Sequence, residues 1–329
     1  MHHSSAPPGR SPGGFYRRQG SRGRHSPETP TRMLARLQRC ITLGLLACAL
    51  AWLWFWLPSR PVIALLGVAL LISGHAWFLA YEMWHMQRLN QADPAPRATR
   101  QQVVWAWLRE CWTAPTVFCW RQPFFSNQVP DHLPHDALGR RGVVLIHGLV
   151  CNRGFWTPWL RRLLARDQPF IAVDLEPVVA DIESYRAIVE AAVSRITETT
   201  GLPPVLLCHS MGGLVARDWL REGRNHQRIA RVVTIASPHH GTWLGRHARS
   251  GSGLQMQQGN AWLAALADTE EPALLTRFSC WYSNCDNVVF PASTATLPWA
   301  DNRLVVGLPH VAMAFDPQLM AEVLQEVAD

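Results

Sequence analysis

The sequence contains no lysine, so all 31 basic residues among its 329 are arginines. Eight of these arginines, against a single acidic residue, lie in residues 1–40, which carry a net charge of 8 − 1 = +7. The rest of the chain is neutral, because 31 − 8 = 23 arginines balance 24 − 1 = 23 acidic residues. A nucleic-acid-binding protein needs a basic face on its folded body, so this balance argues against a nucleic-acid partner.

Cysteines spaced for a metal site are also missing. None of the eight cysteines forms a C-x2-C pair, the spacing of zinc ribbons and fingers, so the sequence predicts no metal site. Most of the cysteines stand in apolar runs, where we expect small core residues. Cys280 and Cys285 are close enough in the chain to pair in an oxidising compartment, and the sequence leaves their redox state open.

Aliphatic residues are almost absent from residues 1–32, where serine, proline, glycine, arginine and histidine predominate. Such a segment cannot bury enough apolar surface to order itself, so we predict a disordered basic tail. Two alternative interpretations of this tail remain open. In the first, the tail binds anionic lipid. In the second, it lies upstream of the true translation start, and Met33 is the initiator.

Two long apolar runs follow, at residues 41–57 and 62–81, with a proline-containing turn between them. Each run approaches the ~20 residues that span a bilayer, so we predict a transmembrane helical hairpin over residues 33–90. Arginines flank the outer ends of both runs, and only Arg60 lies in the turn. This distribution places both ends and the rest of the chain on the cytoplasmic side of the inner membrane. The competing interpretation is a cleaved signal peptide that starts at Met33.

Residues 91–139 begin with the linker sequence DPAP at 93–96 and then become rich in tryptophan and phenylalanine. This stretch is too interrupted by charged residues and Pro115 to cross a membrane. It is interpreted as a linker and a membrane-proximal segment. It either lies along the membrane interface or packs on the following domain as its first strands, and the sequence does not separate the two.

Strands and helices alternate through residues 140–329, which predicts an α/β domain with a mostly parallel sheet flanked by helices. The expected strands are 142–146, 169–175, 205–207, 232–236, 278–282 and 304–306. The expected helices are 155–165, 182–199, 212–221 and 317–327. In such a sheet, ligands bind at the carboxyl ends of the strands.

A serine stands at one of these carboxyl ends, in the stretch VLLCHSMGGLV at residues 205–215. A buried strand, a sharp turn with Ser210 at its tip and a following helix are the elements of a nucleophile elbow. Cys208 occupies the place of the first glycine in the usual G-x-S-x-G pattern, which is a departure. The alternative interpretation is a serine that caps a helix after a core strand.

Two further residues follow strands in the order that this type of site requires. Asp286 comes after the expected strand 278–282, and His310 comes after 304–306. Ser210 is the predicted nucleophile, His310 its base and Asp286 the acid that orients the histidine, with Asp301 as a reserve acid. The backbone N–H groups of Leu149 and Met211 are the predicted oxyanion hole.

Three stretches carry a family resemblance: VLIHGL at 144–149, HSMGG at 209–213 and VTIASPHHGT at 233–242. With them, residues 140–329 resemble the α/β-hydrolase superfamily, in particular its bacterial triacylglycerol lipase and esterase branch. The resemblance implies a serine carboxylic-ester hydrolase that needs no cofactor or metal ion. It also implies a lid, which falls at about residues 241–275.

The apolar residues of this expected lid indicate a lipid or acyl-ester substrate. We expect His147, Trp243, Leu244 and Trp262 to contact the substrate. The leading hypothesis is a membrane-anchored lipase or esterase that works through a covalent acyl-enzyme. An acyltransferase or thioesterase with the same triad, or an inactive membrane scaffold, are the alternatives.

Overall fold

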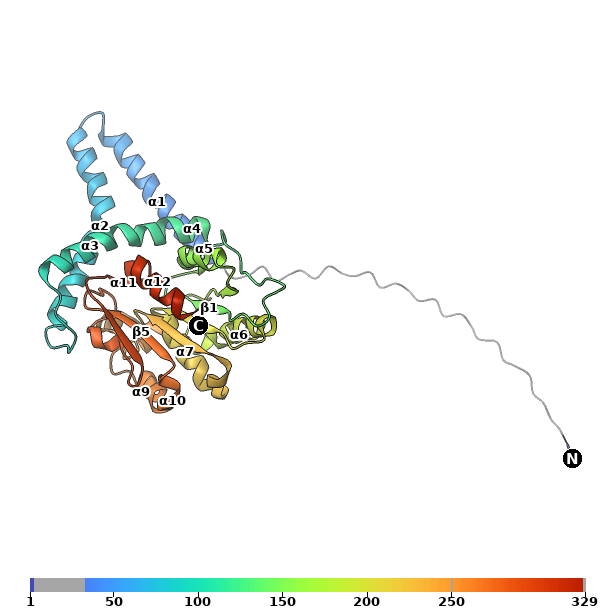
Figure 1. Cartoon of the computed structure of the whole chain (residues 1–329). Coiled ribbons are helices and arrows are strands. Elements are labelled where there is room, and N and C mark those ends of the chain that lie inside the picture. The colour runs from blue at the N-terminus through green and yellow to red at the C-terminus, as the bar shows by residue number, and fades with distance from the viewer. Residues whose placement is uncertain (3–32, 250, 328–329) are drawn as a thin grey trace.

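The computed structural model describes residues 1–2, 33–249 and 251–327. The predicted basic tail therefore lies almost wholly outside the described residues. Figure 1 shows a layered body from which two helices project as a pair.

The centre of the body is a sheet of six strands in the order β2-β1-β3-β4-β5-β6. Every neighbouring pair is parallel. The predicted mostly parallel sheet is thus confirmed, although the last strand begins at Asp301, earlier than expected. The strands are β1 (Val143–Ile146), β2 (Phe170–Ala172), β3 (Val205–His209), β4 (Arg231–Ile235), β5 (Phe278–Ser283) and β6 (Asp301–Val305).

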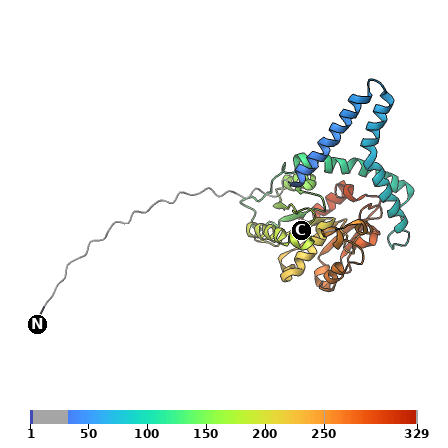
Figure 2. The same ribbon diagram turned by 180° about the vertical axis from the view of Figure 1, so that it is seen from behind.

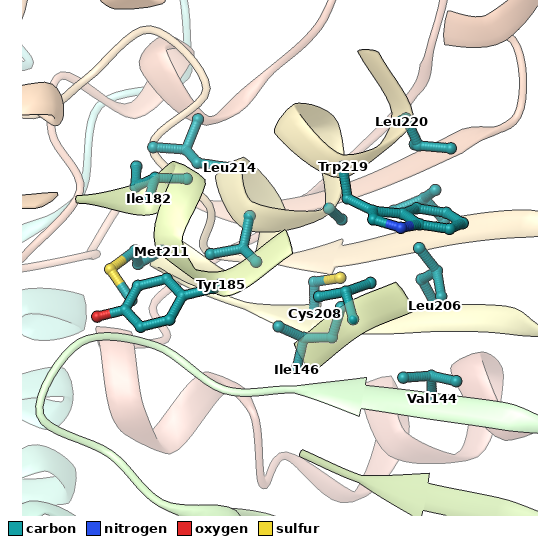
Figure 3. Packing of buried hydrophobic residues seen from close by; sticks show 14 of the residues in the cluster. Val144, Ile146, Ile182, Tyr185, Leu206, Cys208, Met211, Leu214, Trp219 and Leu220 are labelled. Atoms are coloured by element: carbon teal, nitrogen blue, oxygen red, sulfur yellow. The ribbon is translucent and has the colours of Figure 1, made fainter. Parts of the chain in front are cut away.

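Helices cover both faces of this sheet, because alternate residues of each strand point to opposite sides. Val144 and Ile146 of β1 face one apolar cluster, whereas Val143 and Leu145 face another. The first cluster, drawn in Figure 3, packs against α6 (Arg186–Thr200) and α7 (Met211–Arg221). The second packs against α5 (Thr157–Ala165) and α12 (Pro317–Glu326). Burial on both faces explains why the central strands β1 and β3 are nearly continuous apolar runs.

Residues 241–275 form several short helices, which are η6 (Trp243–His247), α8 (Gly251–Gln255), α9 (Ala261–Asp268) and α10 (Pro272–Leu275). Leu263, Leu266 and Leu275 are buried in the same cluster as Leu214 and Trp219 of α7. The second half of this segment is therefore part of the core of the body.

Residues 100–125, which hold all the tryptophans of this segment, are helical, so the alternative that they supply the first strands is wrong. They consist of α3 (Arg100–Pro115), the π-helical turn η2 (Thr116–Arg121) and α4 (Gln122–Phe125). A capping box starts α3, since Gln102 N donates to Thr99 Oγ1 over 3.2 Å and Thr99 N donates to Gln102 Oε1 over 2.8 Å. Pro115 removes a backbone donor from the helix, and the π-helical turn follows at once.

The projecting pair consists of α1 (Met33–Trp56) and α2 (Pro61–Leu89), with the turn farthest from the body (Figures 1 and 2). By length and composition, both helices are apolar enough to cross a membrane. The inner end of α1 and the inner half of α2 pack on the body: Gln38 of α1 donates to Gln122 over 3.0 Å, Trp107 of α3 donates to the carbonyl of Ala76 of α2 over 2.8 Å, and Met83 and Met86 of α2 are buried. Helix α3 lies across the base of the pair, between it and the sheet.

The cysteines are all free thiols in the structure. Cys280 lies inside β5 with its Sγ 3.7 Å from His239 Nε2, whereas Cys285 packs beside Met86 and Phe290. The possible Cys280–Cys285 pair is therefore not formed, because the two thiols are buried in different surroundings.

Candidate active site

Ser210 stands alone between β3, which ends at His209, and α7, which begins at Met211. Its φ of 54° and ψ of −128° lie in a region that non-glycine residues rarely adopt, at a cost of roughly 1–3 kcal/mol. The backbone N–H of Ser210 donates to the carbonyl of Ile235 over 2.9 Å and helps to hold this turn. Gly212 is needed because a Cβ there would overlap the carbonyl oxygen of Ile146.

Cys208 replaces the usual first glycine without strain. It is an ordinary strand residue paired with Ile146 and Thr234, so its backbone needs no glycine. Its side chain is fully buried near Ile146, Leu206 and Met211 (Figure 3). Burial raises the pKa of the thiol, which keeps it uncharged and unreactive.

The structure brings Ser210, His310 and Asp286 together. His310 Nε2 lies 3.1 Å from Ser210 Oγ, and His310 Nδ1 lies 3.0 Å from each carboxylate oxygen of Asp286. Asp286 is held in turn by the N–H groups of Val288 and Val289, at 2.9 and 2.8 Å from its Oδ1. A serine, an imidazole and a buried acid in this chain of hydrogen bonds can activate the hydroxyl as a nucleophile.

Charge around the imidazole sets its protonation. Burial by itself lowers the pKa of His310, but the charge and hydrogen bond of Asp286, helped by Glu110 and Glu82, outweigh burial and raise it above the usual value. Asp301, the reserve acid, begins β6 at the opposite end of the strand and pairs with Arg303 at 2.6 Å. It therefore lies away from Ser210 and His310.

The backbone around Gly148 passes directly beside Ser210. A Cβ on Gly148 would lie 2.8 Å from Ser210 Cβ and 3.3 Å from its Oγ. The next residue, Leu149, lines the same cavity as Ser210. Met211 is the first residue of α7, so its N–H has no acceptor within the helix. Both predicted oxyanion donors thus belong to backbone that borders the serine.

A cavity of about 400 Å³ opens above Ser210. The floor belongs to the carboxyl edge of the sheet, and the cover comes from α2, α3 and η2. Most of the lining is apolar, with Glu82, Glu110 and Asn287 among its few polar groups. The covering residues are His75, Phe78, Leu79, Glu82, Glu110, Ala114 and Phe118.

The predicted lid is displaced from this position, because α2 and α3 occupy it. Among the described residues of 241–275, only Thr242 and Met256 reach the cavity. Trp243 instead stacks on His85, with ring centres 4.4 Å apart, and Leu244 packs beside Met83 and Met86. Trp262 donates its indole N–H to Glu183. Trp243, Leu244 and Trp262 are therefore not lining residues, contrary to expectation.

His147 is not a lining residue either. It is buried, its Nε2 accepts the N–H of Leu175 over 3.1 Å, and its Nδ1 lies 2.9 Å from the Gly148 carbonyl. Burial lowers its pKa to about 4, so the ring is neutral. His147 braces the loop that carries Leu149, and this bracing is its role in place of the expected substrate contact.

Two acidic residues of the site went unrecognised in the sequence. Glu110 of α3 is buried and accepts the backbone N–H groups of Val311 and Ala312. Glu82 of α2 accepts from Asn287 Nδ2 over 2.7 Å, and Asn287 Oδ1 accepts the N–H of His310 over 3.2 Å. The sequence feature that could have identified them is an acidic residue within an apolar or tryptophan-rich helix. Acidic residues rarely occupy such a position without a function.

A model of the alpha/beta hydrolase family matches residues 143–327, more than half of the chain. The protein is therefore a member of the alpha/beta hydrolase family, which confirms the resemblance seen in the sequence. Among solved structures, it is similar to the mature form of the lipase BlEst2 from Bacillus licheniformis, with a TM-score of 0.52 and 18% identity over 59% of this chain and 95% of that one. It is also similar to lipase B from Aspergillus fumigatus, with a TM-score of 0.52 and 18% identity over 58% of this chain and 53% of that one. These likenesses establish the fold. A search of curated proteins found no match.

Proposed function

We propose that this protein is a membrane-associated serine hydrolase that cleaves carboxylic esters of apolar acyl groups. The observation that carries the proposal is the hydrogen-bonded chain from Ser210 Oγ through His310 to Asp286, at an elbow with the strained serine backbone of this family. The similarity to two lipases supports an ester as substrate.

In the proposed reaction, Ser210 Oγ attacks the ester carbonyl while His310 Nε2 takes its proton. The N–H groups of Leu149 and Met211 stabilise the oxyanion of the tetrahedral intermediate. His310 then returns the proton to the leaving alcohol, and the C–O bond breaks to leave an acyl group on Ser210. Water attacks this acyl-enzyme by the same steps in reverse and releases the acid. Asp286 holds the imidazole in the required tautomer and stabilises its charged form.

The apolar cavity supports an acyl chain as the bound part of the substrate. Phe78, Leu79 and Phe118 present hydrocarbon above the serine, and burying apolar surface there favours binding by about 25 cal/mol per Å². One of the helices that cover this cavity, α2, also projects from the body, so a substrate dissolved in a membrane lies close to the serine.

The outer surface of the N-terminal helices supports membrane association. Side chains such as Leu46, Trp54 and Leu66 stay exposed on α1 and α2, which is costly in water. On α3, Trp105 and Trp112 are 58% and 79% exposed, on the face opposite buried Glu110. Tryptophans on such a face are typical of a helix that lies at a membrane interface. We propose that α1 and α2 cross the inner membrane, with the hydrolase domain on its cytoplasmic side as the arginine distribution indicates.

Labelling with a fluorophosphonate probe in detergent-solubilised membranes tests the nucleophile. We expect the wild type and a control variant, Ser194→Ala on α6, to be labelled equally and Ser210→Ala not at all. Hydrolysis of p-nitrophenyl octanoate should follow the same pattern. Persistent labelling or ester cleavage in Ser210→Ala would refute the mechanism. For orientation, a C-terminal reporter that is active only in the periplasm would refute the proposed topology.

A further inference from the structure

The short helix α11 (His310–Met313) carries the candidate base, and its first turn is held from outside. The first residues of a helix have N–H groups without intrahelical acceptors. Here the N–H of His310 donates to Asn287 Oδ1, that of Val311 to Glu110 Oε1 over 2.8 Å, and that of Ala312 to Glu110 Oε2 over 3.0 Å. Both oxygens of Glu110 are thus committed to the residues that directly follow the histidine.

Glu110 reaches this position from a distant part of the chain. It lies on α3, about 200 residues before α11, and it is only 1% exposed. Burial raises the pKa of its carboxyl to about 7, which shows how unfavourable this place is for a charge. Its two hydrogen bonds to backbone favour the ionised form and offset part of that cost. An uncharged side chain could also accept hydrogen bonds from the first N–H groups of α11, and its burial would cost less free energy than the burial of a carboxylate.

We propose that Glu110 is a positioning residue for His310, so that α3 is part of the catalytic machinery as well as part of the cavity wall. This inference rests on the proposed function, since it assigns Glu110 a task in that reaction. Glu110 does not touch the reacting atoms. It holds the first turn of α11 so that the imidazole stays between Ser210 Oγ and Asp286.

The charge of Glu110 also acts on the base. The ionisable groups that face His310 are Asp286, Glu110, Glu82 and His209, whose Nε2 lies 3.2 Å from the His310 carbonyl oxygen. An ionised Glu110 stabilises the imidazolium, so replacing it by a neutral residue lowers the pKa of His310. The acidic limb of the pH profile of kcat/KM must then move to lower pH, because this limb reports the pKa of the base in the free enzyme.

The test compares full-length wild type with Glu110→Gln, Glu110→Asp and the control Glu198→Gln, which removes an exposed charge on α6. The readout is the pH profile of kcat and KM for p-nitrophenyl octanoate, with thermal unfolding measured alongside. For Glu110→Gln we expect kcat to fall by between about 10-fold and about 100-fold, as for a base displaced by up to about 1 Å. The acidic limb should move to lower pH, with KM little changed. Glu110→Asp keeps the charge, so its limb should stay near that of the wild type while kcat falls less.

An acidic limb for Glu110→Gln that coincides with the wild type would overturn the inference, whatever the fall in kcat. A purely structural loss lowers kcat without moving the titration of the base. If Glu110→Gln does not fold, Glu110→Asp carries the test, and an unchanged kcat in that variant would overturn the inference. A wild type no faster than Ser210→Ala would instead refute the proposed function, and this inference with it.

Discussion

Replacing Gly148 by alanine should disable the site without unfolding the protein. The added methyl would lie 2.8 Å from Ser210 Cβ and 3.3 Å from both Ser210 Oγ and the His209 carbonyl oxygen. All three neighbours belong to the tight turn at residues 209–210, so the loop of residues 148–149 must yield. That movement takes the Leu149 N–H away from the developing oxyanion. The loss of one such donor corresponds to a roughly 10²- to 10³-fold lower kcat, or about 2.7–4 kcal/mol.

The loss should appear in kcat and leave KM nearly unchanged, because the donor acts on a charge that exists only in the transition state. Overpacking should also lower the free energy of unfolding by about 1–3 kcal/mol. Steady-state kinetics with p-nitrophenyl octanoate and thermal unfolding measure the two effects. The matched control is Gly74→Ala on α2, where an added Cβ meets nothing within 4 Å and activity should persist. A kcat for Gly148→Ala within about threefold of the wild type would refute the assignment of the oxyanion donor.

Three further predictions concern charge. Because the pKa of His310 is raised and the base must be neutral, kcat/KM should fall as pH drops through a value above the usual ~6.5; a limb below that value would contradict the assignment. Asp286→Asn should lower kcat by about 10⁴-fold in steady-state assays with the fold retained, since the histidine loses its tautomer control; a loss below tenfold would exclude Asp286. Glu270→Ala leaves the guanidinium of Arg217, paired at 2.6 Å and only 1% exposed, without its partner. The free energy of unfolding in urea should fall by about 3–5 kcal/mol, and a change below about 1 kcal/mol would show that the pair is dispensable.

The parts of the fold that could be predicted were those coded by contiguous residues. Strands β1 to β4 are short, mainly apolar runs, and the turn around Ser210 combines a strand, a tight turn and a helix within eleven residues. Asp286 and His310 could be placed because each follows its own strand. Secondary structure of this kind can be predicted from the sequence, because it depends mainly on residues that are close together in the chain.

The cover of the cavity could not be predicted in the same way. Whether α3 lies on a membrane or on the body depends on contacts between segments about 200 residues apart, and no local pattern encodes such a contact. Trp243 and Leu244 are apolar and lie where a lid is expected, yet they pack against α2 and Phe290. The apolar character of a side chain indicates that it is buried, but not which segment it packs against. Trp243 and Leu244 pack against the N-terminal part of the chain.

The packing of Glu110 against α11 bears on how this protein can be dissected. Cutting the chain before residue 140, the predicted start of the catalytic domain, removes α1 and α2, the proposed membrane anchor. That fragment would lose the roof of the cavity, and the Val311 and Ala312 N–H groups would lose the carboxylate that holds them. Its inactivity would therefore say nothing about the need for a membrane. The N-terminal helices and the candidate active site are packed together in this protein, so they have to be purified and assayed together.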